Sequence, residues 1–351
     1  MFTLHNLLVF IPILGLLVFV HELGHFLAAK WAGIRVERFS LGFPPRMFGK
    51  KIGDTDYCIS WIPLGGYVKM AGMIDESMDT EIEGKPDEFM SKAVWKRAIV
   101  IGAGPFMNIV LALLFWTGLT YQDGVPEPTN LPVIDQVIPE MPAAGAGLQK
   151  NDRILAVNGE AVATWEQLTK LIHANPQKEI LLEIDRQGER VQQRVTPRLD
   201  AADQKGKIGI AQKFEMRPAG LGEAFSVACI RSWFLTREIG KFIGRLFSGQ
   251  ESVRDGLAGP LLMMKMAGQI AREGLGDLMH FIAVISLQLA LLNLLPIPAL
   301  DGGHLLFLGM ETILRRPVSV RARVVVQQIG MALLLALMVF IVINDVQKLF
   351  K

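Results

Sequence analysis

Four apolar segments, each long enough to cross a bilayer, constrain the fold of this chain more than any other feature. They lie within residues 1–31, 98–121, 278–308 and 324–345. A helix needs about 20 mostly apolar residues to span the hydrocarbon core. With 51% hydrophobic and 20% charged residues, the chain is too apolar for an ordinary soluble protein and too polar to be membrane throughout. The sequence therefore predicts a polytopic α-helical membrane protein with four transmembrane helices and a substantial water-exposed part.

Basic residues are distributed unevenly around these segments. Lys30 and Arg35 follow the first segment, and Lys96 and Arg97 precede the second. Four arginines lie in the short link between the third and fourth segments, whereas the stretch from Gln122 to Gln149 contains no Lys or Arg. Because cytoplasmic loops collect Lys and Arg, we expect the loop 32–97 and the short link to be cytoplasmic. Both termini and the long region after the second segment are then expected outside the cytoplasm.

The sequence H-E-L-G-H at 21–25 lies inside the first apolar segment. On a helix, side chains four residues apart share a face, so His21 and His25 can bind one Zn²⁺. Glu22 beside them can act as a general base on a water molecule. The chain has 2 cysteines, too few for a disulfide framework or a cysteine-based metal site. Its net charge of +2 does not indicate a nucleic-acid-binding protein. Since ionisable residues in hydrocarbon are usually functional, the motif predicts a metal hydrolase whose metal lies in the membrane.

The third apolar segment contains N-L-L-P-I-P-A-L-D-G-G-H at 293–304. Its two prolines prevent a regular helix, and its two glycines allow a sharp bend. Irregular backbone at membrane depth is tolerated only where it lines a cavity or is buried in protein. Asp301 is therefore the candidate third ligand, because a carboxylate facing Zn²⁺ is neutralised. A loop at the membrane edge with a solvated Asp301 is the alternative, and the spacing of His304 would permit a second contact.

These two motifs together resemble those of a known family. H-E-x-x-H in a first span, with N-x-x-P-x-P-x-L-D-G in a later one, is similar to the site-2 intramembrane zinc metalloproteases, in particular the bacterial RseP-like regulators of sigma-E. The resemblance implies that His21, His25 and Asp301 bind Zn²⁺. It implies that Glu22 is the catalytic base and that Asn293 contacts the substrate backbone or stabilises the tetrahedral intermediate. It also implies a multi-pass protein of the bacterial cytoplasmic (inner) membrane.

The loop between the first two spans resembles the membrane-associated β-loop of that family. Residues 40–70 begin with S-L-G-F-P-P, end with I-P-L-G-G-Y-V-K-M and contain a β-prone stretch at 55–61. Peptide hydrolysis requires an extended backbone. An exposed strand edge at Gly65, Gly66 and Tyr67 can hold an unwound substrate by β-addition. An ordinary cytoplasmic hairpin is the alternative.

In the second span, G-P-F-M-N at 104–108 is similar to the G-P-x-x-N element of the family. Small residues let helices approach closely, and Asn108 can hydrogen-bond across them. We expect this element to pack the core near the site rather than to take part in the chemistry.

From 131 to 200 the pattern changes to a small α/β module. We expect a strand at 133–138, a helix opened by a capping box at 164–167, and a hairpin of 179–185 with 190–196. The A-G-L…D-x-I…V-N-G run resembles a PDZ domain of bacterial proteases, single here where RseP-like members carry two. Such domains accept a peptide strand or C-terminus at a sheet edge.

The region 220–277 is expected to form interfacial helices beneath this domain. Its first part has an apolar face, while charges such as Arg231, Arg237 and Lys241 argue against a span. A surface helix of the external domain is the alternative. Residues 252–260 resemble a family segment that leads back to the membrane, and we assign them no chemistry.

These observations favour an intramembrane zinc endopeptidase acting in regulated intramembrane proteolysis. The resemblance supplies the substrate class: transmembrane segments of single-pass membrane proteins, such as anti-sigma factors or remnant signal peptides. Expected partners are these substrates, the lipid bilayer and a peptide at the PDZ domain, with no nucleic acid. A membrane PDZ adaptor with a structural or inactive metal site is the alternative. A zinc protease with a soluble-facing site is disfavoured, since no downstream glutamate stands in a helical context to serve as its third ligand.

Overall fold

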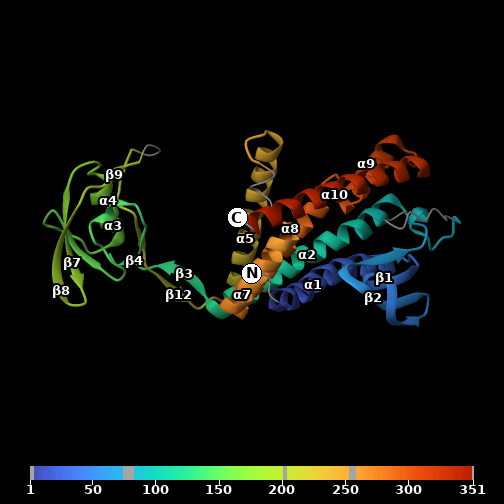
Figure 1. The fold of residues 1–351 in the computed structure, drawn as a ribbon, viewed down its shortest axis with the longest axis horizontal. Helices are drawn as coiled ribbons and strands as arrows, with labels where there is room; N and C mark the ends of the chain where they lie inside the picture. Colours follow the sequence, from blue (N-terminus) through green and yellow to red (C-terminus); the bar gives the residue numbers. More distant parts are fainter. Residues whose placement is uncertain (1–3, 74–82, 201–203, 253–257, 350–351) are drawn as a thin grey trace. The chain divides into compact units, whose positions relative to one another are not determined.

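The chain forms two compact units (Figure 1) in a computed structural model that describes residues 4–73, 83–200, 204–252 and 258–349. The membrane unit consists of residues 1–120 and 221–351, and the inserted unit consists of residues 121–220. Every residue predicted to form the metal site belongs to the membrane unit.

Four helices of the membrane unit are long and apolar enough to cross a bilayer: α1 (Leu4–Trp31), α2 (Val94–Asp123), α8 (Leu275–Asn293) and α10 (Val320–Leu349). Only 11% to 33% of the most apolar window of each is buried inside the protein. Most of their apolar side chains therefore face outward, where lipid can solvate them. Phe10 and Leu17 of α1, Leu111 of α2 and Phe281 of α8 share one buried core. The predicted polytopic helical membrane fold is confirmed.

The third apolar segment is not one continuous helix. α8 ends at Asn293, residues 294–300 are irregular, and α9 (Asp301–Leu314) begins at the aspartate. The two prolines of this loop lack the backbone N–H that a helix requires, and Ala299 adopts a positive φ of 72°. The expected segment 278–308 thus comprises most of one helix, a loop and the first turns of another.

A single antiparallel sheet of β1 (Val36–Ile52) and β2 (Thr55–Met70) packs beside α1. Both strands bend sharply at bulges, so that one part of a strand can pair with two different parts of the other strand. Residues 36–41 pair with 66–70 on one side and with 56–59 on the other, and 56–59 pair in turn with 48–51. The segment 66–70 is consequently one edge of the sheet. The sheet is far longer than the β-prone stretch expected from the sequence.

Two further helices, α5 (Leu221–Phe247) and α7 (Pro260–Glu273), and a short 3₁₀ turn, η1 (Phe89–Ser91), complete the membrane unit. The buried carboxylate of Asp345, near the end of α10, accepts hydrogen bonds from the backbone N–H groups of Gly259, Leu261 and Leu262 at 2.9–3.0 Å. A carboxylate at a helix N-terminus satisfies its orphan donors, so α7 is fastened to a transmembrane helix. Residues 253–257 of the expected segment 252–260 lie outside the described residues.

The inserted unit is an α/β module with its own core, which includes the fully buried Ile154, Leu168 and Leu182. Its main sheet has the order β6-β5-β7-β8. The strands of this sheet are β5 (Arg153–Val157), β6 (Glu160–Ala161), β7 (Ile180–Arg186) and β8 (Glu189–Val195). The other strands pair as β3 (Val125–Pro128) with β12 (Phe214–Arg217), β4 (Ile134–Val137) with β11 (Ile210–Gln212), and β9 (Arg198–Leu199) with β10 (Gly206–Lys207). Its helices are α3 (Pro142–Gly145) and α4 (Trp165–His173).

Local signals explain the elements of the inserted unit. The Thr164 hydroxyl caps α4 by accepting a hydrogen bond from the Gln167 backbone at 3.2 Å. β7 and β8 are joined by Gln187-Gly188, both with positive φ, which matches the twist of a hairpin. The protein is therefore a polytopic helical membrane protein with a β-sheet loop and an inserted α/β domain, as predicted.

Candidate metal centre and active-site cavity

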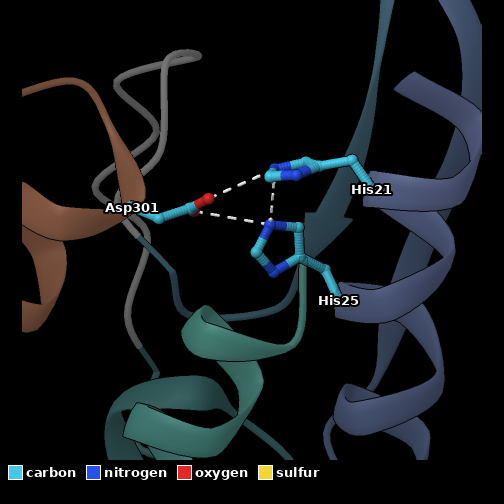
Figure 2. A group of neighbouring side chains, drawn as sticks. All are labelled: His21, His25 and Asp301. Atoms are coloured by element: carbon cyan, nitrogen blue, oxygen red, sulfur yellow. Dashed lines mark hydrogen bonds and ion pairs between the residues drawn. The ribbon is translucent and has the colours of Figure 1, made fainter. Parts of the chain in front are cut away.

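α1 presents the imidazoles of His21 and His25 on one face, directed at the first residue of α9 (Figure 2). His21 Nε2 lies 3.2 Å from Asp301 Oδ2, and His25 Nε2 lies 3.4 Å from Asp301 Oδ1. The two Nε2 atoms are 3.1 Å apart. The three side chains are between 9% and 15% exposed, so their donor atoms are largely withdrawn from water.

The type and spacing of these donors fit zinc. Tetrahedral zinc with bonds of about 2.0–2.1 Å separates neighbouring donor atoms by about 3.3 Å. The three distances between the donors, 3.1–3.4 Å, agree with that value. Two imidazoles and one carboxylate leave the fourth position open, which is the composition of a catalytic rather than a structural site.

The other ring nitrogen of each histidine is directed at α2. His25 Nδ1 lies 2.8 Å from the backbone carbonyl oxygen of Val100 and donates its proton to it. This hydrogen bond leaves the lone pair of His25 Nε2 facing Asp301. His21 Nδ1 lies 3.3 Å from the side-chain amide of Asn108. α2 therefore supplies a polar contact behind each imidazole.

Close approach of α1 and α2 requires two glycines. A Cβ at Gly104 would lie 2.7 Å from His25 Cε1 and 2.8 Å from His21 Cε1, and a Cβ at Gly24 would lie 2.7 Å from the backbone carbon of Ala103. All three distances are far below van der Waals contact. Gly104, the first residue of the G-P-F-M-N sequence, thus lets the α2 backbone pack directly against both imidazoles.

The irregular loop 294–300 sets the position of Asp301. A Cβ at Gly302 or Gly303 would overlap the carbonyl groups of this loop, and a Cβ at Gly330 of α10 would overlap Pro298. Glycines at the start of α9 and in α10 therefore allow the loop to fold tightly between the two helices, with the aspartate at its end.

A cavity of about 290 Å³ opens beside the three donors. Its wall contains every residue that the sequence predicted for the site: His21, Glu22, His25, Gly65, Gly66, Tyr67, Asn293 and Asp301. It also contains His304, for which the sequence left a contact with the site undecided. The fold thus brings together residues from α1, the sheet, the end of α8 and the start of α9.

The sheet edge 66–70 forms one side of this cavity. A Cβ at Gly66 would lie 3.5 Å from Glu22 Cγ, so the strand passes directly beside the carboxylate. The Tyr67 ring is stacked on Phe43, with ring centroids 6.3 Å apart and planes 6° apart. An extended strand edge and a carboxylate therefore face the same cavity as the metal donors.

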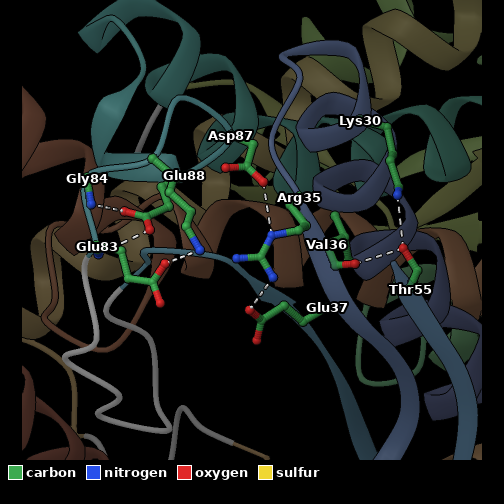
Figure 3. Close-up of polar contacts among 10 residues, drawn as sticks. Lys30, Arg35, Val36, Glu37, Thr55, Glu83, Gly84, Asp87 and Glu88 are labelled. Atoms are coloured by element: carbon green, nitrogen blue, oxygen red, sulfur yellow. Dashed lines mark hydrogen bonds and ion pairs between the residues drawn. The ribbon is translucent and has the colours of Figure 1, made fainter. Parts of the chain in front are cut away.

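Polar contacts fix the sheet and the segment before α2 to the end of α1 (Figure 3). Lys30 donates a hydrogen bond to the Thr55 hydroxyl at 2.9 Å, which links α1 to β2. Arg35 pairs with Asp87 at 3.0 Å. The buried carboxylate of Glu88 accepts a hydrogen bond from the Gly84 backbone at 2.9 Å. The first contact ties the sheet to the helix that carries the histidines, and the other two order the segment before α2.

The contacts of α2 with the histidines went beyond the sequence prediction. The G-P-F-M-N motif pointed to packing near the site, and a polar Asn108 inside an apolar span was the available signal for more. The Val100 contact uses a backbone carbonyl, which no side-chain pattern can indicate.

Known proteins are similar in sequence to nearly the whole chain. The model of peptidase family M50 matches residues 9–337. The chain is 32% identical to zinc metalloprotease RasP of Geobacillus kaustophilus over an alignment of 423 positions, gaps included, covering 99% of each chain. It is 32% identical to the regulator of sigma-W protease RasP of Bacillus subtilis over an alignment of 421 positions, gaps included, again covering 99% of each chain.

Among solved structures, the PDZ domain of the SdrC-like protein of Listeria monocytogenes matches 25% of this chain and 93% of its own, with 18% identity and a TM-score of 0.22. The expected enzyme class and zinc cofactor are confirmed by the family and the relatives. A family match and relatives that extend over nearly the full length show that the chain belongs to peptidase family M50, the site-2 family of membrane zinc metalloproteases.

Proposed function

We propose that this zinc metalloprotease cleaves transmembrane segments of single-pass membrane proteins inside the bilayer, in regulated intramembrane proteolysis. The observation that carries the proposal is the cavity shared by His21, His25, Asp301 and Glu22 with the sheet edge, all within a unit of transmembrane helices. The name of the Bacillus subtilis relative, a regulator of sigma-W protease, supports anti-sigma factors as one substrate class. Remnant signal peptides are the second.

In this proposal His21, His25 and Asp301 hold Zn²⁺, which supplies a Lewis acid for the scissile carbonyl and for water. Glu22 accepts a proton from the attacking water as the new C–O bond forms. It then passes this proton to the leaving nitrogen as the C–N bond breaks. Its position beside the donors supports both steps.

Substrate binding is assigned to the end of α8 and to the sheet edge. The Asn293 amide donates a hydrogen bond to the substrate backbone or to the carbonyl oxygen that gains charge. Gly65, Gly66 and Tyr67 hold the unwound segment as an added strand. The position of all four residues on the wall of the cavity supports this assignment.

We further propose an orientation in the bacterial inner membrane with the basic loops in the cytoplasm and both termini outside. Trp31 and Trp95, at the ends of α1 and α2 beside those loops, are 61% and 55% exposed and have ring centroids 6.0 Å apart. Tryptophans favour the membrane–water interface. His25 lies six residues from Trp31, which is about 9 Å along a helix. The cut would therefore lie near the cytoplasmic side and release a fragment there.

The region outside the cytoplasm would then contain a PDZ domain at 131–200 that accepts a peptide strand or C-terminus of the substrate. The helices of 220–277 would lie at the outer interface. Trp233 and Phe234 of α5 are 70% and 59% exposed and alternate with Arg231 and Arg237, a mixture that suits lipid headgroups.

The test is cleavage of a tagged single-pass substrate in membranes by the wild type and by Glu22→Gln at equal zinc content. We expect the variant to retain zinc and to lose activity by about 10²- to 10⁴-fold, because it lacks the proton acceptor. Glu238→Gln, on the exposed face of α5, is the matched control and should cleave normally. Equal cleavage by Glu22→Gln would exclude the assigned role and leave the PDZ adaptor as the better description.

A further inference from the structure

Asn108 contacts His21 on the side of the imidazole that faces away from Asp301. The Asn108 side-chain amide lies 3.3 Å from His21 Nδ1, and the residue is completely buried. Its backbone carbonyl accepts a hydrogen bond from the hydroxyl of Ser286 on α8 at 2.8 Å, and Ser286 is also completely buried. Asn108 therefore contacts α1 through its side chain and α8 through its backbone, and its amide has no access to water.

The atom of Asn108 that faces His21 decides which ring nitrogen can bind a metal. A neutral imidazole carries one proton. When the amide nitrogen donates to Nδ1, the proton is on Nε2, and Nε2 has no lone pair for zinc. In this orientation the Asn108 Oδ1 atom is buried without a hydrogen-bond partner.

Turning the amide by about half a turn reverses this assignment. Amide nitrogen and oxygen occupy nearly the same space, so the turn leaves the packing unchanged. Oδ1 then accepts the proton of His21 Nδ1, and the lone pair of Nε2 faces Asp301, 3.2 Å away. The Val100 carbonyl already makes the equivalent contact with His25 Nδ1 at 2.8 Å.

We propose that Asn108 is a positioning residue of the metal site, whose amide oxygen holds His21 in the tautomer that binds zinc through Nε2. α2 then provides one acceptor for each histidine ligand, a backbone carbonyl for His25 and a side-chain oxygen for His21. The proposal rests on the ligand set given under the proposed function, and it adds a residue that touches neither substrate nor metal.

The test measures zinc affinity of the full-length protein in detergent by competition with a chelator, independently of activity. Asn108→Leu, similar in size but without an acceptor, should weaken zinc binding by about 10- to 100-fold. Asn108→Asp, whose carboxylate can only accept at this position when ionised, should bind zinc about as tightly as the wild type. Ser286→Ala, which removes a polar group from the same layer but leaves the amide, is the matched control and should also bind normally.

The proposal is overturned if Asn108→Leu binds zinc like the wild type, or if Asn108→Asp loses as much affinity as Asn108→Leu. The second result would mean that the amide hydrogen is what His21 requires. If Asn108→Leu does not fold, Asn108→Asp decides alone: retained affinity supports the proposal and lost affinity overturns it. A His25→Ala arm tests the ligand set separately, since unchanged affinity there would refute the ligands rather than the role of Asn108.

Discussion

Among single residues, Gly104 is the position where the metal site tolerates least. We expect Gly104→Ala to lower the zinc content of the purified protein sharply, because the added methyl group would lie 2.7–2.8 Å from ring atoms of both histidines. The measurement is zinc per chain by atomic emission. Gly102→Ala, two residues earlier on the same helix, has nothing within 4 Å of its Cβ and should keep full zinc content. Full occupancy in both variants would mean that the histidines can move aside.

The proposed roles of His21, Glu22 and His25 could be predicted from the sequence because the spacing of side chains on one helix is a local property. Asp301 could be added only through the broken third span and the family resemblance, since 276 residues separate it from His25. The contacts that α2 makes with the histidines depend on tertiary packing and could not be predicted in this way. Whether Asn108 faces His21 or a neighbouring helix depends on how α1 and α2 rotate against each other, which hydrophobicity alone does not determine.

At the scale of elements, a buried charge cluster fixes α9 to two transmembrane helices. Glu311 of α9 accepts two hydrogen bonds from Arg97 of α2, at 2.8 and 3.1 Å, and one from Arg323 of α10 at 3.0 Å. The three residues are only 4–9% exposed. Glu311 lies ten residues after Asp301, about 15 Å along the same helix, so this cluster anchors the helix that carries the third donor.

We expect Glu311→Gln to lower the melting temperature in detergent and the zinc content together. Removing one partner of a buried charge pair costs about 3–5 kcal/mol, because the remaining charges stay buried without compensation. Lys241→Gln, which breaks an exposed ion pair on α5, should leave both quantities unchanged. An unaltered melting temperature in Glu311→Gln would show that water reaches the cluster and screens it.

The helices were predictable because a spanning segment is defined by length and apolarity, and the prolines at 296 and 298 marked where the third one breaks. The sheet was predictable only in part. The stretch 55–61 has the β-branched and aromatic composition of a strand, but β1 continues through Gly42, Pro44 and Pro45, which local propensity does not assign to a strand. Pairing with β2 on both sides overrides that propensity.

In the whole molecule, the inserted unit is attached through a two-stranded ribbon. β3 and β12 pair from Val125 opposite Arg217 to Pro128 opposite Phe214. Since these ends lie next to each other, residues 125–217 can be replaced by a short glycine-rich linker without stretching the chain. We expect the shortened protein to keep its zinc and to cleave full-length substrates that the intact enzyme leaves uncut, because the inserted unit, proposed to be a PDZ domain, would no longer exclude them by size.

The measurement is cleavage of a full-length and a pre-shortened substrate side by side, with zinc content determined on the same samples. Unchanged discrimination between the two substrates would assign selectivity to the membrane unit instead. Zinc loss in the shortened protein would contradict the separation of the two units.

The two-unit organisation could be anticipated from the change in pattern after the second span. The limits of the inserted unit could not be anticipated. The compact unit extends from 121 to 220, whereas the pattern that resembles a PDZ domain covers 131–200. The difference consists of short strands, β3 and β10 to β12, of two to four residues each. In strands of that length the alternation of apolar and polar residues is too short to predict each strand from the sequence.

The separation of the metal donors along the chain has a consequence for the timing of synthesis. Two donors come from α1 and the third from α9, 276 residues after His25. At a translation rate of about 5–20 residues per second, roughly 14 to 55 s pass between synthesis of the two parts. During that interval the proposed metal site lacks its third ligand. With the ligands proposed here, a ribosome that stalls before Asp301 leaves an inactive product, and activity begins only after the start of α9 has been made.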